Sequence, residues 1–345
     1  MKGKVILIVF IGFFLFCAGQ IFGWFGIEAS PADVSSVVDK VIEKEEYVPE
    51  KMIFVGDMMF DRGVESLMQA NSFIYPIEMI ADFLKSFDFS IGNLEGPINE
   101  SPKEFSDASL TFSFDKKIID SLKLGNFKVV SLANNHTLNM DREGLEETKT
   151  ILKENEINYS GDPIDCDIDY SYQKDGITFY SVNVTYPSNC SNTEIASWIK
   201  DTKFYNPESF FVVLVHWGTE YKTINSSYQQ ELAHKMIDAG ADLIIGGHPH
   251  VVQNIEEYNG KLIFYSLGNF IFDQYFSKET QEGLGVGMEI YPDKKVYNLY
   301  GIKNKSSQAQ LMDDEEKKIF LESLAENSSE ELKESIKSGI IEIKD

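Results

Sequence analysis

The 345-residue chain carries 55 acidic and 31 basic residues, a formal net charge of −24 at pH 7. Such a surface repels phosphate backbones, and no basic run offsets it, so we expect no nucleic-acid partner. Hydrophobic residues make up 43% of the sequence, which is enough for a sizeable core in one large domain or two small ones.

The first 27 residues are predicted to form a transmembrane anchor. Lys2 and Lys4 precede an apolar stretch from Val5 to about Ile27, interrupted only by Gln20, and about 20 apolar residues suffice to span a bilayer. Basic residues before the stretch and acidic residues after it predict that the N-terminus lies inside the cell and the rest of the chain outside it. Cleavage as a signal peptide near Cys17–Gln20, followed by secretion, is the alternative.

The remainder divides into a polar stalk (28–50), one domain (51–303) and a charged, helical C-terminal extension (304–345). In the domain, short apolar runs typical of strands alternate with amphipathic stretches typical of helices. Strands are predicted at Met52–Val55, Phe87–Ile91, Phe127–Leu132, Ile177–Val184, Phe210–Val215, Asp242–Ile245, Leu262–Tyr265, Val286–Ile290 and Val296–Ile302.

Helices are predicted at Gly144–Glu154 and Ser227–Ala239, the second with Gly240 as its C-terminal stop. Tyr258–Lys261 predicts a two-residue hairpin turn, and Tyr291–Lys294 a second turn. Parallel and hairpin signals together indicate an α/β domain with two packed sheets.

Two of the three cysteines, Cys166 and Cys190, lie beyond the apolar N-terminal stretch. An oxidising compartment would permit a disulfide between them. Sequence spacing does not define the geometry of the two cysteines, so the sequence does not decide whether this disulfide forms.

Four of the five histidines lie in three short loops, each directly after an apolar strand; they are His136, His216, His248 and His250. The fifth, His234, lies in a helical pattern and is expected to be an ordinary surface or core residue. Two acidic loops that hold Asp57 and Glu95 follow strands in the same way. Loops at the carboxyl ends of strands in an α/β sheet converge on one crevice, so we expect these side chains to meet there.

Carboxylates, an amide oxygen from Asn135 and imidazoles, without cysteine, suit one or two divalent ions of Mn, Fe or Zn. More than four candidate ligands indicate room for two ions about 4 Å apart, which together activate water for hydrolysis. Taken singly, each residue has a structural alternative: Asp57 as a helix cap, Asn135 in a turn, each histidine as a packing residue. The shared placement in loops after strands favours the metal site.

The order of these motifs resembles the CapA family of bacterial capsule and poly-γ-glutamate synthesis proteins, a branch of the calcineurin-like metallophosphatase superfamily. The matching segments are Gly56–Arg62, Gly92–Glu95, Ala133–His136, His216–Tyr221, Gly247–Val251 and Tyr265–Phe270. The resemblance implies a four-layer αββα sandwich, two sheets between layers of helices.

The resemblance also implies roles by position. The metal ligands it implies are Asp57, Glu95, Asn135, His216, His248 and His250. Asp57 and His250 would hold one metal, Glu95 would bridge, and the other three would hold the second metal.

Three further residues are implied in catalysis. His136 would be the general acid or a contact to the transition state, and Arg62 and Glu220 would line the site. Asn269 would hold the loop after the last strand. Classical metallophosphatases carry a His two residues after the first Asp, where this sequence has Met59. We therefore expect the first metal position to be one ligand short and the second to be complete.

The predicted function is metal-dependent phosphoesterase-type hydrolysis outside the membrane, in capsule or poly-γ-glutamate synthesis or export. A non-catalytic scaffold that handles polymer in an export complex is the alternative, and a relic fold that keeps its histidines for structure is a third reading. The expected partners are the membrane, other capsule-synthesis membrane proteins and an anionic polymer.

Overall fold

The computed structural model describes residues 47–103 and 110–344. The predicted membrane anchor (1–27) and most of the predicted stalk lie outside these residues. Within the described ranges, none of the helices combines the length and the apolar character needed to cross a membrane. One compact unit runs from Pro49 onward, and the domain boundaries inside it stay predictions.

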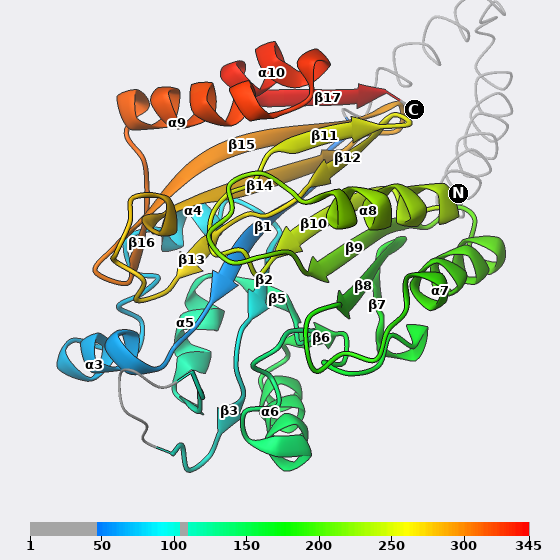
Figure 1. Cartoon of the computed structure of the whole chain (residues 1–345). Helices are drawn as coiled ribbons and strands as arrows, with labels where there is room; N and C mark the ends of the chain where they lie inside the picture. Colours follow the sequence, from blue (N-terminus) through cyan, green and yellow to red (C-terminus); the bar gives the residue numbers. More distant parts are fainter. Residues whose placement is uncertain (1–46, 104–109, 345) are drawn as a thin grey trace, which may run out of the picture. The chain divides into compact units, whose positions relative to one another are not determined.

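The larger of two main sheets is nine-stranded (Figure 1). Its strands, in sheet order, are β16 (Gln308–Leu311), β15 (Lys294–Lys305), β14 (Glu282–Ile290), β1 (Glu50–Met58), β2 (Phe89–Leu94), β5 (Phe127–Ser131) and β6 (Asn158–Ser160), with β13 (Asn269–Ile271) beside β1 and β17 (Ile340–Lys344) beside β15. From β1 to β6 the pairing is parallel, whereas β14, β15, β16 and β17 are antiparallel to their neighbours.

The smaller sheet is six-stranded and parallel at its centre. In order, its strands are β11 (Ile255–Tyr258), β12 (Lys261–Phe264), β10 (Leu243–Gly247), β9 (Phe210–His216), β8 (Ile177–Asn183) and β7 (Tyr172–Lys174). A two-stranded ribbon is formed by β3 (Ile98–Asn99) and β4 (Phe114–Asp115).

The helices pack on these sheets. They are α3 (Arg62–Ala70), α4 (Ala81–Leu84), α5 (Ile118–Leu124), α6 (Asp141–Glu154), α7 (Asn192–Tyr205), α8 (Ser227–Ala239), α9 (Asp314–Asn327) and α10 (Lys333–Ser338), with short 3₁₀ turns at Ile168–Tyr170, Glu279–Gln281 and Glu330–Leu332. Local chemistry explains several of their ends. In α8, Ser226 and Gln229 form a capping box, and Gly240 ends the helix in the left-handed conformation.

Alternate residues of the central strands pack into different cores, because successive side chains of a strand point to opposite faces. Phe54 of β1 lies in the core between the two sheets, whereas Ile53 and Val55 pack toward α3 to α6. In β9, Leu214 faces the other sheet and Val213 packs against α7 and α8. Helices therefore cover the outer face of each sheet (Figure 1). This confirms the predicted mixed α/β class with two packed sheets.

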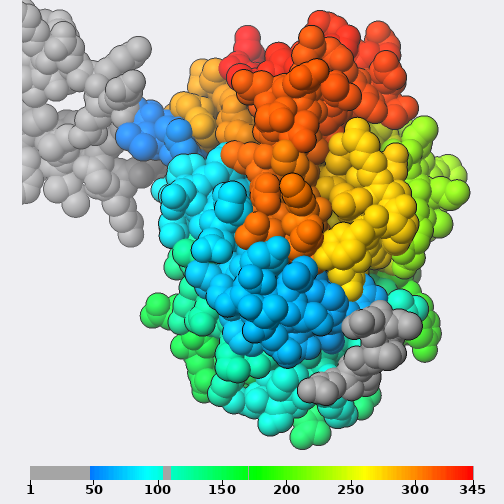
Figure 2. Space-filling view, turned by 90° about the vertical axis from the view of Figure 1, so that its left-hand side faces the viewer, coloured from blue at the N-terminus to red at the C-terminus, as the bar shows by residue number. Residues whose placement is uncertain are grey.

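Every strand predicted from the sequence overlaps an observed strand, and both predicted helices and both hairpin turns are present. Residues 304–345 differ in part from the expected helical extension. They contain α9 and α10, but β16 and β17 also join the nine-stranded sheet. Strand β16 contacts the early part of the domain, where Ala309 N donates to Pro76 O at 2.9 Å. Figure 2 shows the orange part of the C-terminal segment against the blue early segment.

Cys166 and Cys190 are free thiols in the structure. Both lie at the core between α7, α8 and the six-stranded sheet. The structure thus places the two cysteines in one neighbourhood, but it contains no disulfide between them.

Candidate metal centre

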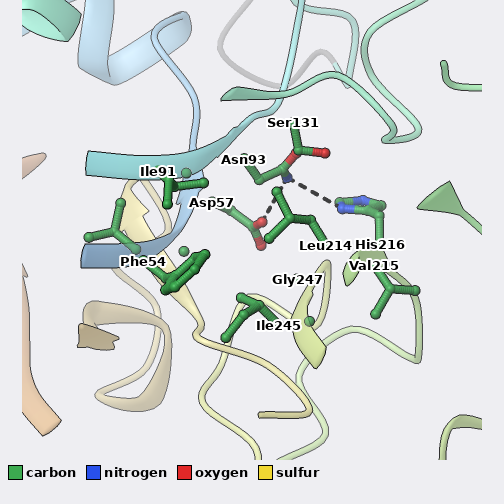
Figure 3. A pocket seen from close by; sticks show the side chains of 14 residues that line it. Phe54, Asp57, Ile91, Asn93, Ser131, Leu214, Val215, His216, Ile245 and Gly247 are labelled. Carbon is green, nitrogen blue, oxygen red and sulfur yellow. Dashed lines mark hydrogen bonds between the residues drawn. The ribbon is translucent and has the colours of Figure 1, made fainter. Parts of the chain in front are cut away.

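The predicted ligands meet at the carboxyl ends of strands from both sheets. Asp57 lies near the end of β1, Glu95 follows β2 and Asn135 follows β5, all in the larger sheet. His216 ends β9 in the smaller sheet, and the loop after β10 carries His248 and His250. Figure 3 shows Asp57 and Asn93 of one sheet facing His216 of the other.

Asp57, Glu95 and His250, here called the buried triad, form the innermost part of the site. Their exposed fractions are 0%, 0% and 3%. His250 Nδ1 lies 3.5 Å from Asp57 Oδ2, and His250 Nε2 lies 3.7 Å from Glu95 Oε1. One ligand atom from each residue lies within 4.8 Å of the other two, so the three can hold one metal ion.

Asn93, which the sequence reasoning did not select, links several members of the site. Its Nδ2 donates to Asp57 Oδ1 at 2.8 Å and lies 3.4 Å from Glu95 Oε2 and 3.3 Å from His216 Nδ1. Asn134 Nδ2 in turn donates to Asn93 Oδ1 at 3.0 Å. The side chain of Asn93 therefore ties the carboxylates of one sheet to the imidazole of the other.

His250 and His248 are oriented from outside the triad. His250 Nδ1 lies 3.0 Å from Asn269 Oδ1, which leaves its Nε2 facing Glu95. The His248 backbone N–H donates to Asp57 Oδ2 at 3.1 Å. Gly247 is required before it, because a Cβ there would lie 2.7 Å from Asp57 Oδ1.

His136 lies beside the triad. Its ring Nδ1 is 3.1 Å from Asn139 Oδ1, and its Nε2 is 3.9 Å from Glu95 Oε1. Its backbone N–H donates to Asn134 Oδ1 at 3.0 Å. If Nδ1 donates to Asn139, the lone pair of Nε2 faces the triad.

The ligands expected for the second metal are arranged differently. Asn135 Oδ1 and His216 Nε2 lie 2.8 Å apart and hydrogen bond to each other. The rings of His216 and His248 are 4.8 Å apart. A second group of three donors within 4.8 Å consists of Glu220, His248 and His250. The first metal position was expected to be one ligand short. Among the described residues, however, its expected ligands Asp57, Glu95 and His250 are the ones that converge.

Met59 and Arg62 contribute in other ways. Met59 is fully buried in the core, where its sulfur accepts from Asp61 N, so it provides no ligand. The Arg62 guanidinium pairs with Asp273 and lies 5.0 Å from the centre of the Phe112 ring. The charge of Arg62 at the edge of the site is therefore paired with the Asp273 carboxylate.

The loops after β9 and β10 both contain residues other than glycine in the left-handed backbone conformation. Tyr221, His248 and His250 have φ values of 63°, 95° and 58°. These are left-handed conformations, which cost on the order of 1–3 kcal/mol each for residues other than glycine and gather at functional sites. The cost is offset in part by Tyr221 N, which donates to Pro249 O at 2.8 Å and joins the two loops.

Burial and mutual charge set the protonation of the triad. Burial raises the pKa of Asp57, but the hydrogen bond and charge of His250 outweigh burial and bring that pKa to about 2. Burial lowers the pKa of His250, but Glu95 and Asp57 raise it to about 9. Burial and the charge of Asp57 raise the pKa of Glu95 well above its usual range. Near neutral pH, without metal, Asp57 and His250 therefore form a charged pair beside Glu95.

The other site histidines favour the neutral form. Burial, with the charge of His248, holds the pKa of His216 well below its usual range. Burial and the charge of His250 lower the pKa of His248 to about 4. Burial lowers the pKa of His136 to about 4 against the hydrogen bond to Asn139. Neutral imidazoles are the form that binds metal.

Two buried atoms test whether the site fits a cation. Within the described residues, Glu95 Oε1 and His248 Nδ1 have no hydrogen-bond partner. Buried polar atoms are almost always paired, so an unpaired carboxylate oxygen and an unpaired imidazole nitrogen in one cluster fit a cation-binding site. The donor set fits a divalent Mn, Fe or Zn ion.

A cavity of about 30 Å³ lies behind the site, between the two sheets (Figure 3). Its lining includes Phe54, Ile91, Leu214 and Ile245 together with Asp57, Asn93 and His216. This volume holds about one or two water molecules. Mostly apolar walls lower the local dielectric constant and strengthen the interactions of Asp57.

Among solved structures, purple acid phosphatase PPD1 from yellow lupin (Lupinus luteus) seeds matches with 10% sequence identity and a TM-score of 0.39. The match covers 78% of this chain and 53% of that one.

Sequence comparisons point to one family. Capsule biosynthesis protein CapA of Bacillus anthracis is 32% identical over 256 residues, which cover 68% of this chain and 62% of that protein. PGA biosynthesis protein CapA of Bacillus subtilis (strain 168) is 31% identical over 248 residues, 67% of this chain and 65% of that protein. The chain thus covers less than two thirds of the length of each relative. The bacterial capsule synthesis protein family PGA_cap matches residues 51–274, most of the domain that holds the site, and the chain belongs to this family.

Proposed function

We propose that this protein is a metal-dependent hydrolase with a phosphoesterase-type site that acts in capsule or poly-γ-glutamate synthesis or export. The observation that carries the proposal is the buried triad, in which Glu95 Oε1 has no hydrogen-bond partner among the described residues. An unpaired carboxylate oxygen at 0% exposure is costly unless a cation meets it. The family membership supports the setting in capsule synthesis.

Each residue has a part in this chemistry. Asp57, Glu95 and His250 would hold the ion, and Asn93 and Asn269 would fix the orientation of these ligands. A bound divalent ion supplies polarisation of a substrate oxygen and lowers the pKa of water. His136 is neutral near pH 7 because burial lowers its pKa to about 4. Its Nε2 is therefore suited to accept a proton, rather than to give one, next to Glu95.

The test uses the full-length protein, purified in detergent without chelator. Metal content is measured by elemental analysis, and hydrolysis is assayed on generic phosphodiester and γ-glutamyl amide substrates. Glu95→Gln should lose bound metal and activity together, whereas Glu208→Gln, at an exposed position before β9, should lose neither. A wild-type protein that binds no metal would contradict the proposal.

A second candidate is a non-catalytic component that holds or guides an anionic polymer. Met59 favours it, since a buried methionine in place of a ligand leaves the triad with three protein donors. A chain of net charge −24 repels a polyanion unless a bound cation intervenes. This version predicts that poly-γ-glutamate binding at low salt disappears after metal stripping, and binding that persists contradicts it.

The proposed location is the outer side of the cell membrane, with residues 1–27 as a single-pass anchor and other capsule-synthesis membrane proteins as partners. The support is the apolar stretch with its basic flank. Protease added to intact cells without an outer barrier should remove the domain and leave the anchor in the membrane fraction. Protection from protease would contradict the orientation, and release into the medium would indicate a cleaved signal peptide.

A further inference from the structure

Glu220 lies at the open side of the site, in a loop whose path is fixed. The loop follows β9, and two backbone hydrogen bonds join it to the end of β10 and to the histidine loop that follows β10. Trp217 N donates to Gly247 O at 3.1 Å, and Tyr221 N donates to Pro249 O at 2.8 Å. Glu220 is held between these two bonds, so its carboxylate is carried toward the histidines.

The Glu220 carboxylate forms a group with His248 and His250, in which one ligand atom of each lies within 4.8 Å of the others. Glu220 is exposed, unlike every member of the buried triad. The two donor groups share only His250. Glu220 and His248, here called the rim pair, are the two members of this group that the buried triad lacks.

An independent observation points to a ligand at this place. His248 is 8% exposed, and its Nδ1 has no hydrogen-bond partner among the described residues. Its backbone is held at φ 95° by the bond from its N–H to Asp57. His248 is thus a strained, buried imidazole whose Nδ1 has no hydrogen-bond partner, and it lies beside an exposed carboxylate. An imidazole and a carboxylate together are typical ligands of a divalent cation.

Two of the residues that the family resemblance implies for the second metal, Asn135 and His216, already use their ligand atoms in hydrogen bonds within the protein. Asn135 Oδ1 and His216 Nε2 hydrogen bond to each other at 2.8 Å, and His216 Nδ1 is 3.3 Å from Asn93 Nδ2. Both nitrogens of His216 thus have partners within the protein. An ion held by Asn135 and His216 would have to break the bond between them.

We infer that Glu220 is a metal ligand, which with His248 forms an outer position for a divalent cation beside His250 and the buried triad. This inference rests on the proposed metal site and changes the residues that hold its second ion. The outer position has Glu220 where the resemblance implied Asn135 and His216. Because Glu220 is exposed, an ion there is reached directly from solvent.

The test compares Glu220→Gln with Asn135→Ala in full-length protein that has been stripped with chelator and dialysed against Mn²⁺. Bound ions are counted by elemental analysis, and electron paramagnetic resonance reports whether neighbouring Mn²⁺ ions are coupled. Glu220→Gln should lose one ion, or weaken binding at least about tenfold, and should lose any spin coupling. Asn135→Ala should keep the wild-type count. Glu279→Gln, at another acidic position, is the matched control.

The outcomes separate the inference from the proposed function. Absence of any bound ion in the wild type overturns the proposed metal site itself. Retention of every ion at unchanged affinity by Glu220→Gln overturns the role of Glu220, whether the wild type holds one ion or two. Loss of an ion by Asn135→Ala and not by Glu220→Gln restores the assignment that the resemblance implied. Glu220 is exposed, so its replacement by Gln should leave the melting temperature of the stripped protein unchanged.

Discussion

The buried triad and the rim pair share one site but are built on different principles. In the triad, Asp57 is bonded to Asn93, and His250 is bonded to Asn269. These supports come from within the sheets, since Asp57 is paired in register with both Asn93 and Asn269. Strand pairing therefore fixes Asp57 and the two asparagines that support the triad, whereas His250 itself lies in the loop after β10.

The rim pair depends on loop geometry instead. Glu220 is exposed, and Tyr221 and His248, which set its surroundings, are held in left-handed conformations. The comparison teaches that the inner part of the site is pre-organised by strand pairing, whereas the outer part is completed by two strained loops. We expect the inner position to bind metal more tightly and the outer one to exchange more readily.

Loss of the Asp57 carboxylate should have the largest effect. Asp57→Asn removes a ligand and leaves the His250 charge without its buried partner, so metal binding should fall at least about 100-fold. The stripped protein should lose about 3 kcal/mol in its free energy of unfolding, since breaking a buried ion pair costs that much or more. Elemental analysis and denaturant titration measure the two effects. Asp201→Asn, on the exposed side of α7, is the control, and equal metal content in both variants would refute the ranking.

Metal binding should be strongly pH-dependent. Without metal, the pKa of His250 is raised from 6.5 to about 9, so its contribution to stability is complete below pH 6.5 and is lost as the pH rises through about 9. A cation that binds through His250 must displace the proton of that imidazole. Affinity should therefore rise by roughly tenfold per pH unit for each proton displaced, up to about pH 9.

Melting temperatures in chelator and in Mn²⁺ check this prediction. The gain in melting temperature on adding metal should widen as the pH rises from 6.5 toward about 9. Calorimetry in buffers of different ionisation enthalpy should show proton release on binding. A gain that stays constant across this range would show that the triad does not bind through His250.

The sequence predicted the location of the site because its main signals are local. Each ligand follows an apolar strand, and strand ends converge in any α/β sheet. Asn93 was missed, although a signal for it exists. It lies two residues before Glu95, and residues two apart share a face of a strand, so both side chains point into the site. The methionine at 59, which was not expected to be a ligand, packs into the core.

What the sequence could not show depends on backbone geometry and long-range pairing. The approach of Glu220 to His248 requires a tyrosine at φ 63°, which nothing in the residue types demands. The support of His250 by Asn269 depends on β13 pairing with β1. The C-terminal strand β17 lies in a charged segment, where only the alternation that buries Ile341 and exposes Ile340 indicates a sheet edge.

Removal of the Asn269 amide should have an intermediate effect. Asn269→Ala leaves His250 Nδ1 without its 3.0 Å partner, so the ring is free to turn away from Glu95. Loss of such an orienting contact typically costs about 10- to 100-fold in metal affinity. The loss should fall mainly on the inner ion, because the Nε2 of His250 faces Glu95 in the buried triad. Equilibrium dialysis with Mn²⁺ measures it, and unchanged affinity for both ions would show that the strand alone fixes His250.

The smallest effect is expected at His234, the one histidine outside the site. Its Nε2 lies 2.7 Å from Glu256 Oε1, and its ring stacks on Tyr258 at 3.7 Å. His234→Ala should lower the free energy of unfolding by about 1 kcal/mol, since it removes one partly exposed hydrogen bond and one ring contact. Metal content and affinity should equal those of the wild type, because both contacts tie α8 to β11 and neither reaches the triad. A parallel fall in metal binding would contradict this prediction. It would show that a change between α8 and β11 alters the geometry of the triad through the six-stranded sheet.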